Sequence, residues 1–294
     1  MADAPYGYYQ RKRGIFSPHD SAPFKLSRTK IDLSRECPRC FYLDRRHGLP
    51  RTSFPAFTLN SAVDNLLKNE FDQYRTKGKP HPLMVEHGID AVPFQHKDLD
   101  TWRHNFTGVQ AIHKPTNFLV FGAVDDIWVK PNGELIVVDY KSTSKQDAPT
   151  LDGYWQEAYK RQMEVYQWLL RQNGFTVDDT GYFVYVNGKS DLPSFDGKLE
   201  FDTDVLSHTG SDAWVEDALT RAKEILLMEA VPPVGENCEY CAYRELTGKK
   251  LIEIHKQQKG SAEEKDGKDG KDEKKPASSS RASSQHTDSQ DTLF

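Results

Sequence analysis

Apolar residues recur at helical spacing between residues 55 and 74, at positions 59, 63, 66, 67, 71 and 74. This period predicts an amphipathic helix, which Gly78-Lys79-Pro80 ends. Nearer the start of the chain, Ser27 is placed to cap a short helix that runs toward the first cysteine, and a second helix carries Phe41–Leu43. Residues 1–23 lack such a period and are expected to be irregular.

After residue 106 the pattern changes to that of strands. Thr107–His113, Phe118–Val129 and Glu134–Lys141 are predicted strands, and Pro131-Asn132-Gly133 forms a turn between the last two. These two strands should therefore pair as an antiparallel hairpin. The later elements are expected to be a helix at 154–172, strands at 182–186 and 199–201, an amphipathic helix at 212–229 and a short helix after Cys241.

Two carboxylates meet on this predicted hairpin. In its second strand Ile136–Val138 is wholly apolar, which indicates a strand buried on both faces. Because side chains alternate along a strand, Asp139 and Lys141 share one face and Tyr140 takes the other. Asp125 comes from the neighbouring strand. An acid and a lysine at the end of a buried strand are costly unless they are paired or bound to a metal.

Carboxylates on adjacent strands predict a Mg²⁺ or Mn²⁺ site, because Mg²⁺ takes a few carboxylates and keeps several waters. Such a metal lowers the pKa of a bound water and clamps phosphate oxygens, which suits phosphodiester hydrolysis. Lys141 would orient the attacking water or stabilise the developing negative charge.

Gly122-Ala-Val-Asp125, the hairpin and Asp139-Tyr140-Lys141 resemble the PD-(D/E)XK nuclease superfamily. The chain is most similar there to RecB-type nuclease domains and the iron–sulfur nucleases of CRISPR adaptation, over about Ser27 to Leu246. The resemblance implies an α/β fold of the restriction-endonuclease-like type, a mixed sheet around a hairpin flanked by helices. It also implies that Asp125 and Asp139 ligate the metal with the Tyr140 carbonyl, and that Lys141 is the catalytic lysine.

The resemblance extends to two helices. Gln162 and Tyr166 match a Q-x-x-x-Y motif and lie four residues apart, so they project from one helix face and would position DNA or active-site groups. In those nucleases an upstream helix supplies a His or Glu to the metal. Asp64 stands in that place here, as a third metal ligand or as a solvated helix residue.

The four cysteines form two C-x-x-C pairs, Cys37 with Cys40 and Cys238 with Cys241. In a cytosolic protein such pairs favour thiolate ligands over disulfides, and two pairs complete a tetrahedral set. The iron–sulfur nucleases have one cysteine in a C-P-R-x-x-Y segment, which Cys37–Tyr42 matches, and three after the core, where this chain has two. Zinc and a [4Fe–4S] cluster both remain open, and the resemblance favours the cluster.

Composition sets further bounds. Hydrophobic residues make up 37% of the 294, charged residues 28%, and the net charge is −5, which differs from the basic balance of a nonspecific nucleic-acid coat protein. The chain lacks both an apolar run of ~20 residues and a signal-peptide pattern, so a cytoplasmic location is predicted. Five arginines between residues 35 and 51 offer a DNA-contact surface or a solvated basic face.

The last part of the chain, from Lys256, is almost free of apolar residues and is expected to be disordered. Its end, Gln290–Phe294, resembles the bacterial sliding-clamp-binding motif, in which a Leu-Phe pair fills an apolar pocket. A polar tail with such a tip would tether the protein near DNA. Chance in a Ser/Gln/Asp-rich segment is the alternative interpretation.

The predicted organisation is an irregular segment at 1–23, a nuclease domain with the four-cysteine site at 24–255, and a tail at 256–294. The predicted function is metal-dependent cleavage of DNA, on single strands or free ends, in repair, recombination or replication. A noncatalytic nucleic-acid-binding module and a zinc-stapled interaction protein on the same fold are the alternatives. The intact Asp125, Asp139 and Lys141 favour catalysis, because a binding role does not need them.

Overall fold

The computed structural model of the protein describes residues 10–52 and 57–266. The chain divides after Cys241 into two units. The first unit carries both β-sheets and all the residues predicted for the nuclease and cysteine sites. The second contains most of helix α8 (Glu239–Asp266). The segment Gln290–Phe294 lies outside the described residues.

A five-stranded mixed sheet forms the centre of the first unit. The strands β6 and β7 are parallel, and the other neighbouring pairs are antiparallel. The predicted hairpin is confirmed, since β5 pairs with β6 in the register Ile127↔Val137. The strands in spatial order are β2 (Val92–Pro93), β5 (Asp126–Val129), β6 (Leu135–Thr143), β7 (Thr180–Gly188) and β8 (Phe201–Thr209).

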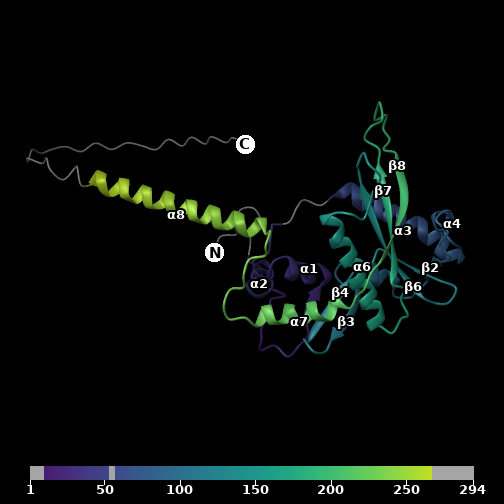
Figure 1. Cartoon of the computed structure of the whole chain (residues 1–294), viewed down its shortest axis with the longest axis horizontal. Helices are drawn as coiled ribbons and strands as arrows, with labels where there is room; N and C mark the ends of the chain where they lie inside the picture. Colours follow the sequence, from purple (N-terminus) through teal and green to yellow (C-terminus); the bar gives the residue numbers. More distant parts are fainter. Residues whose placement is uncertain (1–9, 53–56, 267–294) are drawn as a thin grey trace, which may run out of the picture. The chain divides into compact units, whose positions relative to one another are not determined.

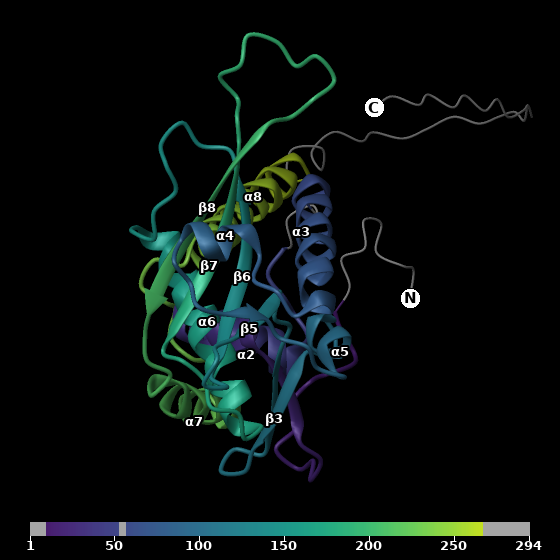
Figure 2. The same ribbon diagram turned by 90° about the vertical axis from the view of Figure 1, so that its right-hand side faces the viewer.

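A second sheet has three strands, in the order β1 (Phe24–Ser27), β4 (Phe118–Gly122) and β3 (Val109–His113). The single strand predicted at 118–129 is therefore wrong: it is divided into β4 and β5, which belong to different sheets. Figure 2 shows β3 away from β5 and β6. At the division Gly122 lies against Tyr166, where an added Cβ would come within 2.5 Å of the ring, and the Val124 amide donates to the Trp102 carbonyl.

Helices cover both faces of the larger sheet. Helix α3 (Thr58–Lys77) lies on one face and α6 (Tyr154–Gln172) on the other (Figure 1). Both helices were predicted, α3 from its apolar period. The remaining helices of the first unit are α1 (Arg28–Glu36), α2 (Pro38–His47), α4 (Pro82–Glu86), α5 (Leu99–Arg103) and α7 (Trp214–Leu227).

Alternation along β6 divides the core between the two layers. Leu135 and Val137 pack in the cluster that includes α6, whereas Ile136 and Val138 pack with Phe71 of α3. Fully burying an aliphatic or aromatic side chain of this kind contributes about 1.5–3 kcal/mol. The same alternation sends Asp139 and Lys141 toward α6 and Tyr140 toward α3, as predicted.

Three elements differ from expectation. Ser27 occupies the N-cap of α1, but its side chain makes no capping hydrogen bond. Strand β8 runs from Phe201 to Thr209 instead of 199–201, because most of its side chains are exposed or half-buried and polar, which hides the apolar alternation. Helix α8 is long rather than short and continues to Asp266, beyond the residue at which disorder was expected to begin.

Among the described residues, none of the helices has the length and apolar character needed to cross a membrane.

Candidate functional site

The carboxylates, the lysine and the amide predicted for catalysis gather beside the second half of β6, which continues past Lys141 to Thr143 instead of ending there. Asp125 lies in the link between β4 and β5, and Asp139 and Lys141 lie in β6. Gln162 comes from α6, and Asp64 comes from α3 on the opposite face of the sheet. Residues up to 100 positions apart in the sequence therefore meet through the packing of two helices on one strand.

On the α6 side, Asp139 is completely buried. Gln162 Nε2 donates to Asp139 Oδ1 at 2.5 Å and to the Tyr166 hydroxyl at 3.1 Å. The Lys141 ammonium forms an ion pair with Asp139 Oδ2. The predicted Gln162–Tyr166 pair thus acts on the carboxylate directly, by fixing one of its oxygens.

Burial sets the proton affinity of this pair. Burial raises the pKa of Asp139 to about 6; the Lys141 ammonium acts against the rise, and the Asp125 charge adds to it. Burial acts to lower the pKa of Lys141, but the carboxylates of Asp139 and Asp125 reverse this and raise it. Lys141 is therefore held as a cation, 4.6 Å from the centre of the Tyr159 ring.

On the α3 side, Asp125 Oδ2 accepts a hydrogen bond from the Tyr140 amide at 3.0 Å. The Lys68 ammonium lies 2.7 Å from Asp64 Oδ2 and 3.6 Å from Asp125 Oδ1. Burial raises the pKa of Asp64, and the negative charge of Asp125 raises it further. Asp125 thus interacts electrostatically with Asp64 on one side and with Asp139 on the other.

These groups border a cavity of about 340 Å³. Its lining includes Asp64, Asp125, Tyr140, Lys141 and Tyr159, but not the buried Asp139. The donor set suits a hard cation, because several oxygens and repelling negative charges converge there. The carboxylates of Asp64, Asp125 and Asp139 do not all come within 4.8 Å of one another in the described part of the chain. Lys68 contacts both Asp64 and Asp125, and Lys141 contacts Asp139, so the two lysines neutralise part of the negative charge.

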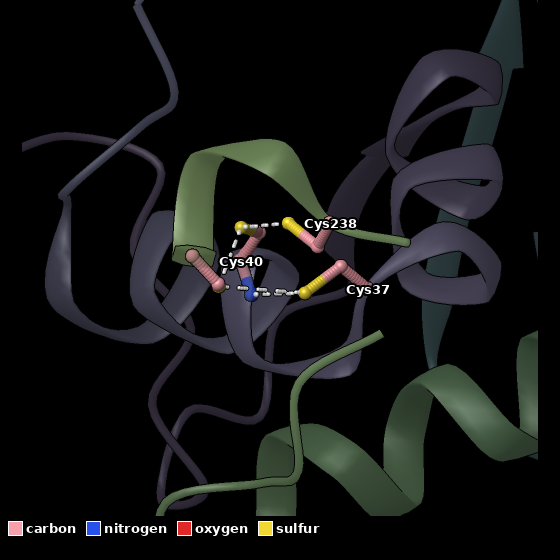
Figure 3. Close-up of side chains that lie close together, drawn as sticks. Cys37, Cys40 and Cys238 are labelled. Atoms are coloured by element: carbon pink, nitrogen blue, oxygen red, sulfur yellow. Dashed lines mark hydrogen bonds between the residues drawn. The ribbon is translucent and has the colours of Figure 1, made fainter. Parts of the chain in front are cut away.

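The cysteine pairs meet as predicted. Among the described residues, Cys37, Cys40, Cys238 and Cys241 form the one set of three or more potential ligands whose atoms all lie within 4.8 Å. Figure 3 shows the side chains of Cys37, Cys40 and Cys238 pointing toward one another. The Cys40 sulfur lies 3.5 Å from the sulfurs of both Cys238 and Cys241. All four are free thiols, so they could hold a metal ion or a cluster.

Local backbone geometry prepares one thiol for ligation. Burial acts to raise the pKa of Cys37, but the amides of Gly235 and Cys40 donate to its sulfur and lower the pKa to about 7. The Arg51 guanidinium lies 3.4 Å from the Cys238 sulfur and also pairs with Glu36 at 2.7 Å. Burial raises the pKa of both Cys40 and Cys241, and the positive charge of Arg51 acts against this rise at Cys40 without overcoming it.

The arginines expected at a DNA-contact surface have structural partners. Arg46 donates to the carbonyls of Leu226 and Met228 at 2.7 Å, and Arg39 donates to the Pro232 carbonyl at 3.0 Å. Arg35 lies over the Trp214 ring, and Arg45 is nearly buried. These contacts pack α1 and α2 against the α7 segment and the loop that leads to the second cysteine pair.

A buried ionic network behind the site was not predicted. Asp126 has 0% exposure and accepts hydrogen bonds from Arg75 Nη2 at 2.5 Å, Arg103 Nη2 at 2.9 Å and the Tyr140 hydroxyl at 2.9 Å. Arg103 also donates from Nε to the Asp125 carbonyl at 3.0 Å. The network fixes the backbone that presents Asp125. Its sequence signal was the Asp125-Asp126 doublet, of which one acid had to face the core.

Comparison with known proteins gives a family match. The family model described as "PD-(D/E)XK nuclease superfamily" matches residues 59–246. This range contains Asp64, Asp125, Asp139, Lys141 and Gln162. None of the curated proteins matches the chain.

Solved structures also match, among them one titled "Crystal structure of SSO0001". It is 13% identical, with a TM-score of 0.32, and the match covers 73% of this chain and 81% of that chain. Because this TM-score is low, the family assignment rests on the family model.

Replacing Asp126 with Ala should lower the free energy of unfolding by about 3–5 kcal/mol, because Arg75 and Arg103 would lose their one buried carboxylate partner and keep only the partly exposed Asp72. Urea unfolding followed by circular dichroism measures the change. The control is Glu224→Ala, which removes an exposed partner of Arg221 and should cost less than about 1 kcal/mol. Equal losses in the two variants would show that the network does not hold the fold.

Proposed function

Since the chain belongs to the PD-(D/E)XK nuclease superfamily, we propose that it hydrolyses phosphodiester bonds in DNA with the help of Mg²⁺ or Mn²⁺. The observation that carries this proposal is the convergence of Asp125, Asp139 and Lys141 along the second half of β6, beside an open cavity. Nucleic acid is the substrate that membership of the family implies.

Asp125 and Asp139 would hold the metal ion, with Asp64 and the Tyr140 carbonyl as further ligands. When bound, the ion supplies a water of lowered pKa and positive charge for phosphate oxygens. Lys141 places an ammonium group in the cavity lining, where it can stabilise the negative charge that develops on the phosphate. Gln162 positions Asp139 through its Nε2 donation, and Tyr166 supports Gln162.

Single-stranded DNA is the substrate class that the surface beside the cavity supports. Tyr154 and Trp155 at the start of α6 are 72% and 73% exposed, and their rings contact each other edge to face. Trp155 stands one helical turn before Tyr159, which lines the cavity. Unpaired bases stack on exposed aromatic rings, and such stacking contributes about 1–3 kcal/mol per base.

The cysteine set would hold a [4Fe–4S] cluster. The alternative is a zinc ion bound by the same four thiolates. The two cysteine pairs lie 198 positions apart in the sequence between Cys40 and Cys238, so the group would join distant parts of the fold. Closing so long a loop removes much chain entropy from the unfolded state.

Asp139→Asn and Lys141→Ala should each lower the rate of DNA cleavage about 100-fold or more, because each removes charge that acts on the phosphate or its metal. The rate is measured on labelled single- and double-stranded oligonucleotides with Mg²⁺ or Mn²⁺. Glu157→Ala, on the exposed surface of α6, is the matched control and should cleave at the wild-type rate. A wild-type rate in either active-site variant would remove that residue from the mechanism.

Trp155→Ala should raise KM for single-stranded oligonucleotides roughly 5- to 100-fold, the equivalent of losing one stacked base, and leave the KM for duplexes unchanged. The control is Phe195→Ala, since Phe195 is equally exposed, at 73%, in the loop between β7 and β8. If both variants change KM alike, or neither does, α6 does not select single strands.

Protein purified without oxygen should contain iron and sulfide and absorb broadly in the visible range, with the absorbance lost on reduction. Cys238→Ser should remove most of the bound metal, since it takes away one of the four thiolates. A colourless protein with stoichiometric zinc would show that the four cysteines bind zinc instead of the cluster. Elemental analysis that finds neither metal would refute both assignments.

A further inference from the structure

A second cavity, of about 360 Å³, lies apart from the proposed active site, and no residue lines both. It is formed by residues between Gly14 and Ser27, together with Arg45 of α2, Asn117, Phe121 of β4 and Lys223 of α7. Small-molecule sites usually have volumes of about 300–1,000 Å³, so the cavity is large enough for a ligand of nucleotide size. The proposed catalytic mechanism makes no use of it.

Three cations border this cavity, and aromatic rings and backbone carbonyls rather than carboxylates hold them: Lys25 donates to the Phe106 carbonyl at 2.7 Å and Arg45 Nη2 to the Gly14 carbonyl at 2.8 Å. The Lys25 ammonium lies 4.5 Å from the centre of the Phe121 ring, and the Lys223 ammonium lies 4.6 Å from that of Phe16. The Arg45 guanidinium lies 5.2 Å from the centre of the Phe24 ring. A ring face attracts a cation without neutralising it.

The lining therefore keeps a net positive charge. In the described part of the chain none of Lys25, Arg45 and Lys223 forms an ion pair with a carboxylate. The lining contains one acid, Asp20, so three positive charges and one negative charge leave a net charge of +2. A concave surface with this excess attracts anions.

Arg45 gives the most specific indication of an anionic ligand. It is only 8% exposed, and its Nε has no hydrogen-bond partner among the described residues. Burial lowers its pKa to about 10, so the guanidinium stays charged at neutral pH. The Asp44 carboxylate favours its charge without contacting it, so one buried donor stays unused, and the planar donor fork of arginine matches the oxygens of phosphate.

The cavity borders the strands that lead into the active site. Phe121 and Ser27, which both line it, are paired in register on β4 and β1. The next residue of β4, Gly122, turns to the opposite face and packs against Tyr166 of α6. The cavity and the Gln162–Tyr166 pair thus contact neighbouring residues of β4.

We propose that this cavity binds the phosphate group of a nucleotide, with its base against the ring of Phe24. Arg45, Lys223 and Lys25 provide the positive charge for the phosphate. The nucleotide is either part of the substrate strand or a free nucleotide, and the chemistry recognised is the same in both cases. Only the strand source rests on the proposed nuclease function.

The first test is calorimetric titration of the full chain, without divalent metal, with thymidine 5′-monophosphate and with thymidine. The monophosphate should bind, and thymidine should bind at least tenfold more weakly. Lys223→Glu should abolish monophosphate binding, and Lys25→Ala should weaken it. Arg221→Ala removes a positive charge from the same helix outside the cavity and should bind like the wild type.

The second test identifies the source. Fluorescence anisotropy in EDTA measures binding of a labelled single-stranded oligonucleotide. At least tenfold weaker binding by Lys223→Glu, with a smaller salt dependence, would assign the cavity to the substrate strand. Unchanged oligonucleotide binding, with loss of monophosphate binding, would assign it to a free nucleotide.

Two outcomes would overturn the proposal: equal binding of thymidine and its monophosphate by the wild type, or an equal loss in Arg221→Ala and Lys223→Glu. Thermal unfolding checks that Lys223→Glu is folded, and Lys25→Ala provides the same comparison if it is not. Neither titration involves cleavage, so a failure here is distinct from a failure of the nuclease assignment.

Discussion

The arrangement of the proposed active site depends on one buried carboxylate, that of Asp126. A buried charge is tolerated only when it is paired and hydrogen-bonded, and Asp126 obtains its partners from three elements: Arg75 of α3, Arg103 of α5 and Tyr140 of β6. These contacts join the helical layer to the sheet where the chain passes from β4 to β5. With Asp126 fixed in the core, its neighbour Asp125 faces the cavity.

This dependence explains which parts of the site the sequence could reveal. Asp125, Asp139-Tyr140-Lys141 and the Gln162–Tyr166 pair follow local rules, namely strand alternation, a turn and helical spacing, so their convergence was predictable. Arg75 and Arg103 belong to different helices and have no such pattern. The single strand expected at 118–129 was wrong for a similar reason: only contacts with Trp102 and Tyr166, distant in sequence, divide it between two sheets.

The cysteines show the same limit. Two C-x-x-C pairs were enough to predict that the four cysteines gather at one site, because four free thiols together satisfy tetrahedral ligation. Spacing carries no information about the metal, since zinc and iron–sulfur clusters both accept four thiolates. The arginines beside them resembled a surface for DNA, yet Arg39 and Arg46 bind backbone carbonyls. Sequence gives the charge of a residue, but only packing determines whether that charge is available.

The chain is acidic overall, yet its family implies a nucleic-acid substrate, which is also negatively charged. The positions of its unpaired positive charges explain how both can hold. The net charge of −5 does not attract phosphate, so attraction has to be local. In the active site, Lys68 and Lys141 are paired with carboxylates, which leaves little free positive charge there. In the second cavity, Lys25 and Lys223 rest on aromatic rings, which hold the side chains without cancelling their charge. On the proposed functions, the acids of the active site would hold a cation for chemistry, and the cations of the second cavity would attract phosphate.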